Sequence, residues 1–426
     1  MRWVSAVFRE PLHYRTVAAN YALNLTRLGW GLAIPVLFLA GIGLATIWIT
    51  DRGPAAAAAS FFVLDPVQPA TGWWDRSLEF LGSLTLRQVL FLVTGAGLMF
   101  ATLYVSYQHI GRYAFVIYWA CIALLALVAL DRYIDLPLVP VVRNTRRWIE
   151  IYGIRLQPSE FVKLGLVLAL ARYLRFRETY RTWRGLVPPF LFTLLPMALI
   201  MFQPDLGTVL MLLPVLFAML FVAGARIRHL ALIVGAAVLL APAFYLWGME
   251  PYQRVRIDVV LKQDSQDEQW HKGPGYQLRQ SKIALGTGGV WGEGFGQGVF
   301  VEHDLLPEEH NDFIFAMIGH QWGFVGGVLV ILAYAVIVLC GIEVATVTND
   351  PFGRLIAVGV VMMIVSQALL NMGMTIGFFP ITGMTLPFVS AGGSSLWANF
   401  VALGLLVNVA QRRPMLIARK PFVFTE

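Results

Sequence analysis

Long apolar segments recur along this chain, each about as long as the ~20 residues that an α-helix needs to cross a bilayer. Short polar segments separate them, so the pattern predicts an all-α integral membrane protein with about ten spanning helices. The segment 161–174 is short, whereas 313–344 exceeds one span, so part of it is expected to tilt or to lie at the membrane interface. The expected helices cover 30–49, 89–107, 113–130, 161–174, 186–202, 207–223, 230–247, 313–344, 355–377 and 394–409.

The basic residues predict the orientation of these helices. Lys and Arg gather in alternate short loops, as they do on the cytoplasmic side of membrane proteins. We therefore expect a cytoplasmic N-terminal arm over 1–29, a membrane domain over 30–411 and a cytoplasmic C-terminal tail over 412–426. The segment 249–311, between the seventh and eighth helices, is then a large loop on the outer side.

Composition and charge agree with this class. Hydrophobic residues make up 58% of the chain and charged residues 13%, against about 25% charged residues in an ordinary soluble domain. The net charge of +7 does not indicate nucleic-acid binding, because the topology accounts for most of the basic residues. Cys121 and Cys340 lie in apolar segments without neighbours at metal-ligand spacing.

An acidic segment, 306–312, directly precedes the eighth apolar segment and ends on Asp312. A carboxylate at the edge of a membrane helix is costly unless it has partners or a function, so Asp312 is the first candidate for chemistry. The alternative is that Asn311 or Asp312 only caps the helix that follows.

One segment that is expected on the outer side is rich in arginine, whereas the positive-inside rule places such residues in cytoplasmic loops. It contains Arg143, Arg146, Arg147 and Arg155, and Lys163 follows just inside the next helix. These residues could pair with the nearby acids Glu150 and Glu160. Alternatively, they could form an outward-facing anion site, since one guanidinium group can donate two parallel hydrogen bonds to phosphate oxygens. Glu160 and Lys163 are three residues apart and therefore share one helix face.

Three further segments mark the same outer side. The turn 203–208 contains Asp205, which could cap the next helix. The glycine-rich segment 286–298 lacks the strand and the Lys-Ser/Thr of a phosphate-binding loop. The segment 380–395 indicates irregular backbone at membrane depth, which persists only where protein or a water-filled cavity surrounds it. All these segments are expected to border one outward-facing cavity.

Several motifs, in order from about residue 88 to the C-terminus, resemble the SEDS family of cell-shape, division and sporulation proteins, and within it RodA more than FtsW. The chain departs from the usual family pattern at Asn311 (usually Thr), at His320 and Gln321 (usually an acidic pair) and at Ala391 (usually Tyr), and its outer segment 51–87 is longer than expected. The matching segments are 147–149 with 157–164, 203–208, 276–281 with the glycine-rich segment, 306–316, 371–373 and 382–395.

The resemblance implies an inverting peptidoglycan glycosyltransferase that polymerises lipid II into β-1,4 glycan strands for cell elongation and shape. Asp312 is then expected to be the general base, and Arg147, Lys163 and Arg146 to bind the pyrophosphate of the donor. Glu160 is expected to orient Lys163, or to bind a divalent cation (Mg or Mn) together with Asp312. The other expected cavity residues are Gln157, Ser159, Asp205, His310, Ser390, Ser394 and Ser395.

Two other functions are compatible with the same polar cavity: a lipid II flippase and a non-catalytic scaffold for a transpeptidase. A flippase needs no base and a cavity open to both faces, and a scaffold needs no charged residues at membrane depth. The chain has no Ser-x-x-Lys motif in a soluble domain, so the resemblance implies a class B penicillin-binding protein as partner, beside lipid II, the nascent strand and other elongation-complex membrane proteins. The expected location is the bacterial cytoplasmic (inner) membrane, with both termini in the cytoplasm.

Overall fold

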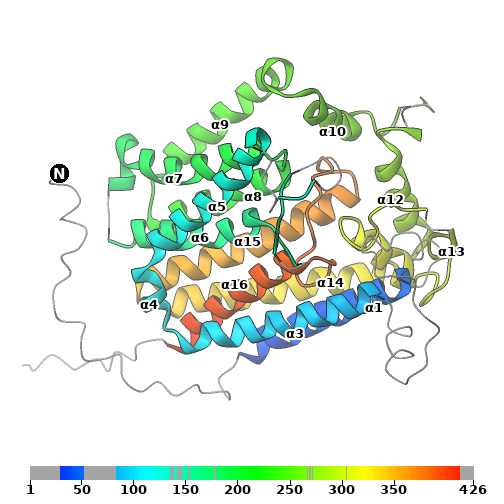
Figure 1. The fold of residues 1–426 in the computed structure, drawn as a ribbon, viewed down its shortest axis with the longest axis horizontal. Helices are drawn as coiled ribbons and strands as arrows, with labels where there is room; N and C mark the ends of the chain where they lie inside the picture. The colour runs from blue at the N-terminus through cyan, green and yellow to red at the C-terminus, as the bar shows by residue number, and fades with distance from the viewer. Residues whose placement is uncertain are drawn as a thin grey trace, which may run out of the picture.

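The computed structural model describes residues 29–51, 83–134, 139–141, 146–151, 154–176, 179–265, 267, 270, 272–303 and 305–412. The expectations for most of the N-terminal arm, the outer segment 52–82, Arg143 and the tail after Arg412 lie outside the described residues. What is described is an elongated bundle of helices, with smaller elements gathered at one end (Figure 1). We call this end, where α10, α12 and α13 lie, the site end.

The expected all-α membrane fold is confirmed. Within the described ranges, nine helices are long and apolar enough to cross a membrane, and α6 (Pro158–Leu174), with 17 residues, is the short tenth helix that the sequence predicted. The nine are α1 (Trp30–Thr50), α3 (Ser83–Tyr104), α5 (Ala114–Ile134), α7 (Trp183–Met201), α8 (Leu206–Ala223), α9 (Ile227–Ala243) extended by a π-helical turn, η4 (Phe244–Gly248), α14 (Ile314–Val347), α15 (Pro351–Thr375) and α16 (Gly393–Gln411).

Shorter elements join these helices, and most of them lie at the site end (Figure 1). Three lie in the segment 249–311, which the sequence analysis treated as a loop; amphipathic helices of this length carry little signal in a polar segment. A two-stranded antiparallel hairpin before α6 pairs Glu150 with Arg155. These elements are α4 (Tyr107–Arg112), β1 (Ile149–Ile151), β2 (Ile154–Leu156), η3 (Thr179–Arg181), α10 (Pro251–Leu261), α12 (Tyr276–Thr287) and α13 (Val299–His303).

The most enclosed helices are α6, α15 and α16. They pack against one another and against α3, α5, α8 and α14. Small residues allow close approach: a Cβ at Gly359 of α15 would meet Val167 of α6 at 2.6 Å, and a Cβ at Gly404 of α16 would collide with Thr102 of α3. By contrast α9 lies at the edge of the bundle, with Leu230 its one buried residue. The enclosed helices therefore form the fixed frame of the site.

Helix α14, which the sequence predicted to exceed one span, is broken within its length; the expected tilt or interfacial position of one part stays a prediction. Gly323 has φ 65° and ψ −161°, so two helical parts, 314–322 and 324–347, meet there. A Cβ at Gly323 would collide with the backbone of Gly292. A glycine inside an apolar segment does not disturb its hydrophobic pattern, so the pattern did not predict the break.

The glycine-rich segment packs backbone to backbone on this break. The amide of Glu293 donates to the carbonyl of His320 (3.0 Å), and the amide of Phe324 donates to the carbonyl of Gly289 (2.9 Å). Gln321 adds two bonds, accepting from the amide of Gly296 (2.7 Å) and donating to the carbonyl of Gln297 (2.9 Å). The residue that departs from the family pattern at 321 therefore holds this segment in place.

Replacing Gly292 by Ala should destabilise α14 around its break at Gly323. Gly292 has φ +87°, and a Cβ would collide with the carbonyl of Gln321, so the change combines a disfavoured backbone, which costs about 1–3 kcal/mol, with a collision. We expect a lower midpoint of thermal unfolding for the purified protein. Gly286→Ala is the control, because a Cβ at Gly286 meets nothing within 4 Å; equal midpoints for the two variants would contradict this packing.

Candidate functional site at one end of the bundle

The irregular segment between α15 and α16 lies inside the bundle, as its sequence predicted. Residues 376–392 form no helix, yet Leu386, Phe388 and Ser390 are buried. Side chains satisfy part of its backbone: Gln88 donates to the carbonyl of Ser390 (3.1 Å), and the Ser390 hydroxyl accepts from the amide of Leu386 (2.7 Å). Non-helical backbone at this depth is possible because protein encloses it.

Asp312 lies in the turn that directly precedes α14, and this turn packs against the irregular segment. The carbonyl of Glu308 accepts from the amides of Asn311 and Asp312 (both 3.1 Å). The amide of Asn371, on α15, donates to the carbonyl of Asp312 (2.9 Å), and a Cβ at Gly383 would lie 3.4 Å from the Asp312 carboxylate. No side chain caps α14, whose N-cap is Phe313, so Asp312 is not held there as a helix cap.

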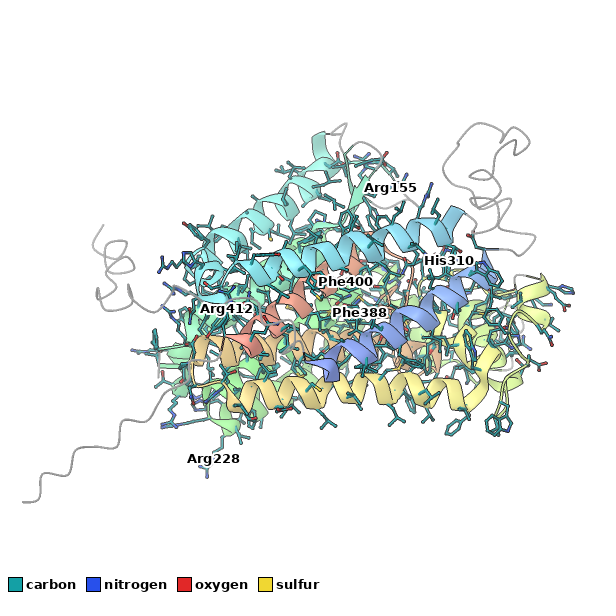
Figure 2. All side chains as sticks on the ribbon, turned by 90° about the horizontal axis from the view of Figure 1, so that it is seen from below. Arg155, Arg228, His310, Phe388, Phe400 and Arg412 are labelled. Atoms are coloured by element: carbon teal, nitrogen blue, oxygen red, sulfur yellow. The ribbon has the colours of Figure 1, made fainter. Side chains whose placement is uncertain are left out.

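Two contacts from the segment before α16 hold the same turn. The Ser390 hydroxyl donates to the carbonyl of Asn311 (2.6 Å), and the amide of Ala391 donates to the carbonyl of His310 (3.0 Å). The position of Asp312 is thus set by α15 and by the segment before α16, both far away in sequence. Figure 2 shows His310 on the same half of the bundle as Arg155, away from Arg412 and Arg228.

Glu160 and Lys163 form a buried ion pair on α6. Lys163 Nζ lies 2.7 Å from Glu160 Oε2, and the side chains are 1% and 7% exposed. Lys163 also donates to Gln367 of α15 (3.3 Å), whose amide donates to the hydroxyl groups of Thr385 (3.0 Å) and Ser395 (3.2 Å). A polar chain therefore crosses the bundle from α6 to α16. Buried pairs add little stability, and their presence in a membrane helix points to function.

Asp205 joins the beginnings of α6 and α8. Its carboxylate accepts from the amide (3.2 Å) and the hydroxyl (2.9 Å) of Thr208, so it caps α8 as one interpretation held. It also accepts from Gln157 (3.3 Å) and Ser159 (3.4 Å). The amide of Gln157 donates to Ser394 at the start of α16 (3.0 Å). Three helix N-termini meet here, and their dipoles favour an anion.

The basic residues divide into two groups. Arg146 pairs with Asp131 (2.9 Å) and Arg155 with Glu150 (2.9 Å), so the pairing interpretation holds for these two side chains. Arg147 instead donates to the carbonyl of Pro204, beside Asp205. Its Nε is buried and has no hydrogen-bond partner among the described residues. Among Arg146, Arg147 and Arg155, Arg147 is the one with a buried donor still to satisfy.

The sequence analysis missed Arg256, on α10. Burial lowers the pKa of its guanidinium, the charge of Arg147 lowers it further, and the charges of Asp205 and Asp312 raise it. Its Nη1 is buried without a hydrogen-bond partner in the described part of the chain. The one available signal was the helical spacing of Gln253, Arg256 and Val259, of which Gln253 and Val259 are buried.

The cluster of Arg147, Arg256, Asp205 and Asp312 is therefore incomplete as it stands. Two guanidinium groups repel each other across a partly buried site, and each keeps an unsatisfied N–H. Leaving such donors unpaired costs about 1–3 kcal/mol each or more, because they are charged. A bound anion with several oxygens would satisfy both. The charge of the Asp312 carboxylate also acts on Arg256, so this carboxylate belongs to the surroundings of such an anion.

Comparisons with known proteins identify the family of this chain. A family model described as "cell cycle protein", for FtsW, RodA and SpoVE, matches residues 73–414. Stage V sporulation protein E of Bacillus subtilis is 36% identical over 344 residues, 80% of this chain and 90% of that protein. Peptidoglycan glycosyltransferase MrdB of Escherichia coli is 32% identical over 80% of this chain and 90% of its own length.

Solved structures show the same fold. A structure described as the coordination of polymerization and crosslinking by a peptidoglycan synthase complex has a TM-score of 0.70 at 29% identity, covering 91% of this chain and 99% of that one. Rod shape determining protein RodA of Thermus thermophilus has a TM-score of 0.62 at 28% identity, covering 92% and 99%. Fold and site thus define a multi-pass membrane enzyme of cell-wall synthesis. The chain belongs to the SEDS family, and it is a peptidoglycan glycosyltransferase.

Proposed function

We propose that this chain polymerises lipid II into β-1,4 glycan strands at the outer face of the cytoplasmic membrane, in support of cell elongation and shape. The observation that carries the proposal is the pair of buried, unsatisfied guanidinium N–H groups of Arg147 and Arg256 beside Asp312. A lipid-linked sugar pyrophosphate supplies the missing anion. A sugar hydroxyl supplies the proton that a carboxylate can remove.

In this mechanism Arg147 and Arg256 bind the pyrophosphate oxygens and stabilise the charge that grows as this leaving group departs. Lys163 contributes positive charge from α6, held in place by Glu160 and Gln367. Asp312 accepts the proton of the attacking hydroxyl while the new glycosidic bond forms opposite the leaving group. Inversion needs no covalent enzyme intermediate and therefore no second carboxylate as nucleophile. Arg146 is paired with Asp131, and its contribution to pyrophosphate binding stays a prediction.

The predicted divalent cation does not fit a ready-made site. Among the described residues no group of three or more His, Cys, Asp and Glu side chains could hold a metal, and Glu160 lies against Lys163 rather than beside a second acid. We therefore derive no step through a metal. The remaining cavity residues, Gln157, Ser159, Ser394 and Ser395, position the helix N-termini around the anion.

We also propose that the site end faces outward and that both termini are cytoplasmic. Arg228 and Arg412 lie at the end of the bundle opposite Arg155 and His310 (Figure 2), as the distribution of basic residues requires. The proposed location is the cytoplasmic membrane of a bacterium.

An assay with purified protein and lipid II tests the proposed function. Elongation of glycan strands supports it. Movement of lipid II between leaflets without elongation would identify a flippase instead, and neither activity in the presence of a transpeptidase partner would indicate a scaffold. For the elongation role, cells depleted of the protein should become round; filaments that fail to divide would assign it to division.

We propose a class B penicillin-binding protein as partner, because a structure with a TM-score of 0.70 to this chain coordinates polymerization with crosslinking. The segment 249–311 carries Arg256 on α10, and its helix α12 packs on α14 just after Asp312. A partner that fixes this segment would fix the anion site before attack and so raise activity.

Hydrogen exchange measures this effect. We expect amides over 249–311 to gain protection when the transpeptidase is added, together with higher polymerisation, while the buried amides of α15 serve as the unchanged reference. Activation without any change in protection over 249–311 would place the control elsewhere.

A further inference from the structure

A cavity of about 250 Å³ is lined by α10, α12 and the segment between them, and both helices lie at the site end (Figure 1). Its base is apolar, with Val259 and Leu278 buried. Its walls and rim carry Gln263, Trp270, Arg279 and Lys282. None of these residues belongs to the cluster around Asp312.

The polar groups of this cavity are not all satisfied. Trp270 Nε1 is buried and has no hydrogen-bond partner among the described residues. The exposed side chain of Arg279 makes no hydrogen bond or ion pair with the described part of the chain. Lys282 makes one long hydrogen bond there, to Gln263 Oε1 (3.3 Å). A buried N–H donor beside two cations points to an acceptor that carries negative charge.

The cavity continues the proposed anion site along α10. Arg256 and Val259 are three residues apart on α10 and therefore share one helix face, and Gln263 follows just after the helix ends. The end of α15 also contacts the cavity wall: Ser281 of α12 donates to the carbonyl of Thr375 (2.9 Å), and Gln263 lies against Gly377. Thr375 is one helical turn beyond Asn371, the residue that holds the backbone of Asp312. The wall of the cavity and the turn of Asp312 are therefore both bonded to the last two turns of α15.

We propose that this cavity binds the peptide of the disaccharide–peptide substrate through a peptide carboxylate. The inference rests on the proposed function, because it takes lipid II or the nascent strand as the ligand. The lipid has no charge outside its pyrophosphate, whereas the peptide combines small apolar side chains with carboxylates, matching the apolar base and cationic rim. At about 250 Å³ the cavity is below the ~300–1,000 Å³ of a typical ligand site, which suits the end of a peptide.

The test uses two synthetic lipid-linked disaccharides with the same pyrophosphate lipid. One carries the full stem pentapeptide, and the other carries a single alanine amide without a free carboxylate. Arg279→Gln/Lys282→Gln removes the two rim charges at exposed positions. We expect the KM of this variant for the pentapeptide substrate to rise by about 10-fold or more, as for lost charge-assisted hydrogen bonds, and its KM for the alanine amide substrate to match wild type.

Two further variants sharpen the result. Trp270→Phe keeps the ring and removes the N–H donor, and it should raise the KM for the pentapeptide substrate alone. Lys272→Gln, a nearby exposed cation outside the cavity lining, is the matched control and should change neither KM. Equal KM values for wild type and double variant on the pentapeptide substrate, or equal losses on both substrates, would overturn the inference. Failure of the wild type to polymerise either substrate would instead overturn the proposed function.

Discussion

Asp312→Asn should lower glycan polymerisation by about 10²–10⁴-fold, the usual contribution of a general base, while the protein stays folded and inserted. The amide has nearly the shape of the carboxylate but cannot accept the proton of the attacking hydroxyl. The backbone contact that places the residue, from Asn371 to the carbonyl of Asp312, is unchanged. The measurement is strand formation from lipid II by the purified variant, with its thermal unfolding midpoint as the check on folding.

Glu302→Gln is the matched control for this change. It makes the same carboxylate-to-amide replacement on α13, at an exposed position, and it should keep wild-type polymerisation. Near-normal strand formation by Asp312→Asn would remove Asp312 from the role of base and leave a positioning role for its carboxylate.

Arg147→Ala and Arg256→Ala should each lower kcat/KM for lipid II by about 10–100-fold, since a hydrogen bond to a charged group contributes roughly 1.5–3 kcal/mol. The loss should be greater in the transition state than on binding, because the leaving group gains charge as it departs. Arg147→Lys should recover only part of the activity. An ammonium group is a point charge and cannot reproduce the two parallel bonds of a guanidinium.

Arg155→Gln separates this effect from a general loss of positive charge. Arg155 is paired with Glu150 on the hairpin at about one-third exposure, and such pairs contribute at most about 1 kcal/mol. Activity should therefore fall by no more than a few-fold. Wild-type activity in both Arg147→Ala and Arg256→Ala would show that these guanidinium groups serve the packing of α10 and the turn 203–208 instead.

The sequence predicted those parts of the site whose signals are local. Asp312 stood out because a carboxylate borders an apolar segment, and Glu160 and Lys163 because charges three residues apart share a helix face. The irregular segment before α16 followed from its Gly, Pro and Ser residues. The structure pairs Glu160 with Lys163 and packs the turn of Asp312 against α15 and the irregular segment, while the roles of these residues stay predictions.

Other parts had no local signal. Arg256 lies in a polar segment where one more arginine is not a signal, and its electrostatic interaction with Asp205 and Asp312 depends on the fold. The neighbours Arg146 and Arg147 have different partners, the carboxylate of Asp131 and the carbonyl of Pro204. Both partners are distant in sequence. At His320 the ring bonds to the Thr287 hydroxyl (2.9 Å), a contact that links α14 to α12 and that no pattern along the chain reveals.

The break at Gly323 has a consequence for how the enzyme meets membranes of different thickness. A straight helix of 34 residues would be about 50 Å long, far beyond a hydrocarbon core of about 30 Å. The part 324–347 alone is about 36 Å long and spans the core with modest tilt. The part 314–322, bonded to the glycine-rich segment, lies beyond that span, so the length that has to match a bilayer is set by 324–347 alone. Asp312, bonded to α15 through Asn371, precedes the break and is not on the part of α14 whose length has to match the bilayer.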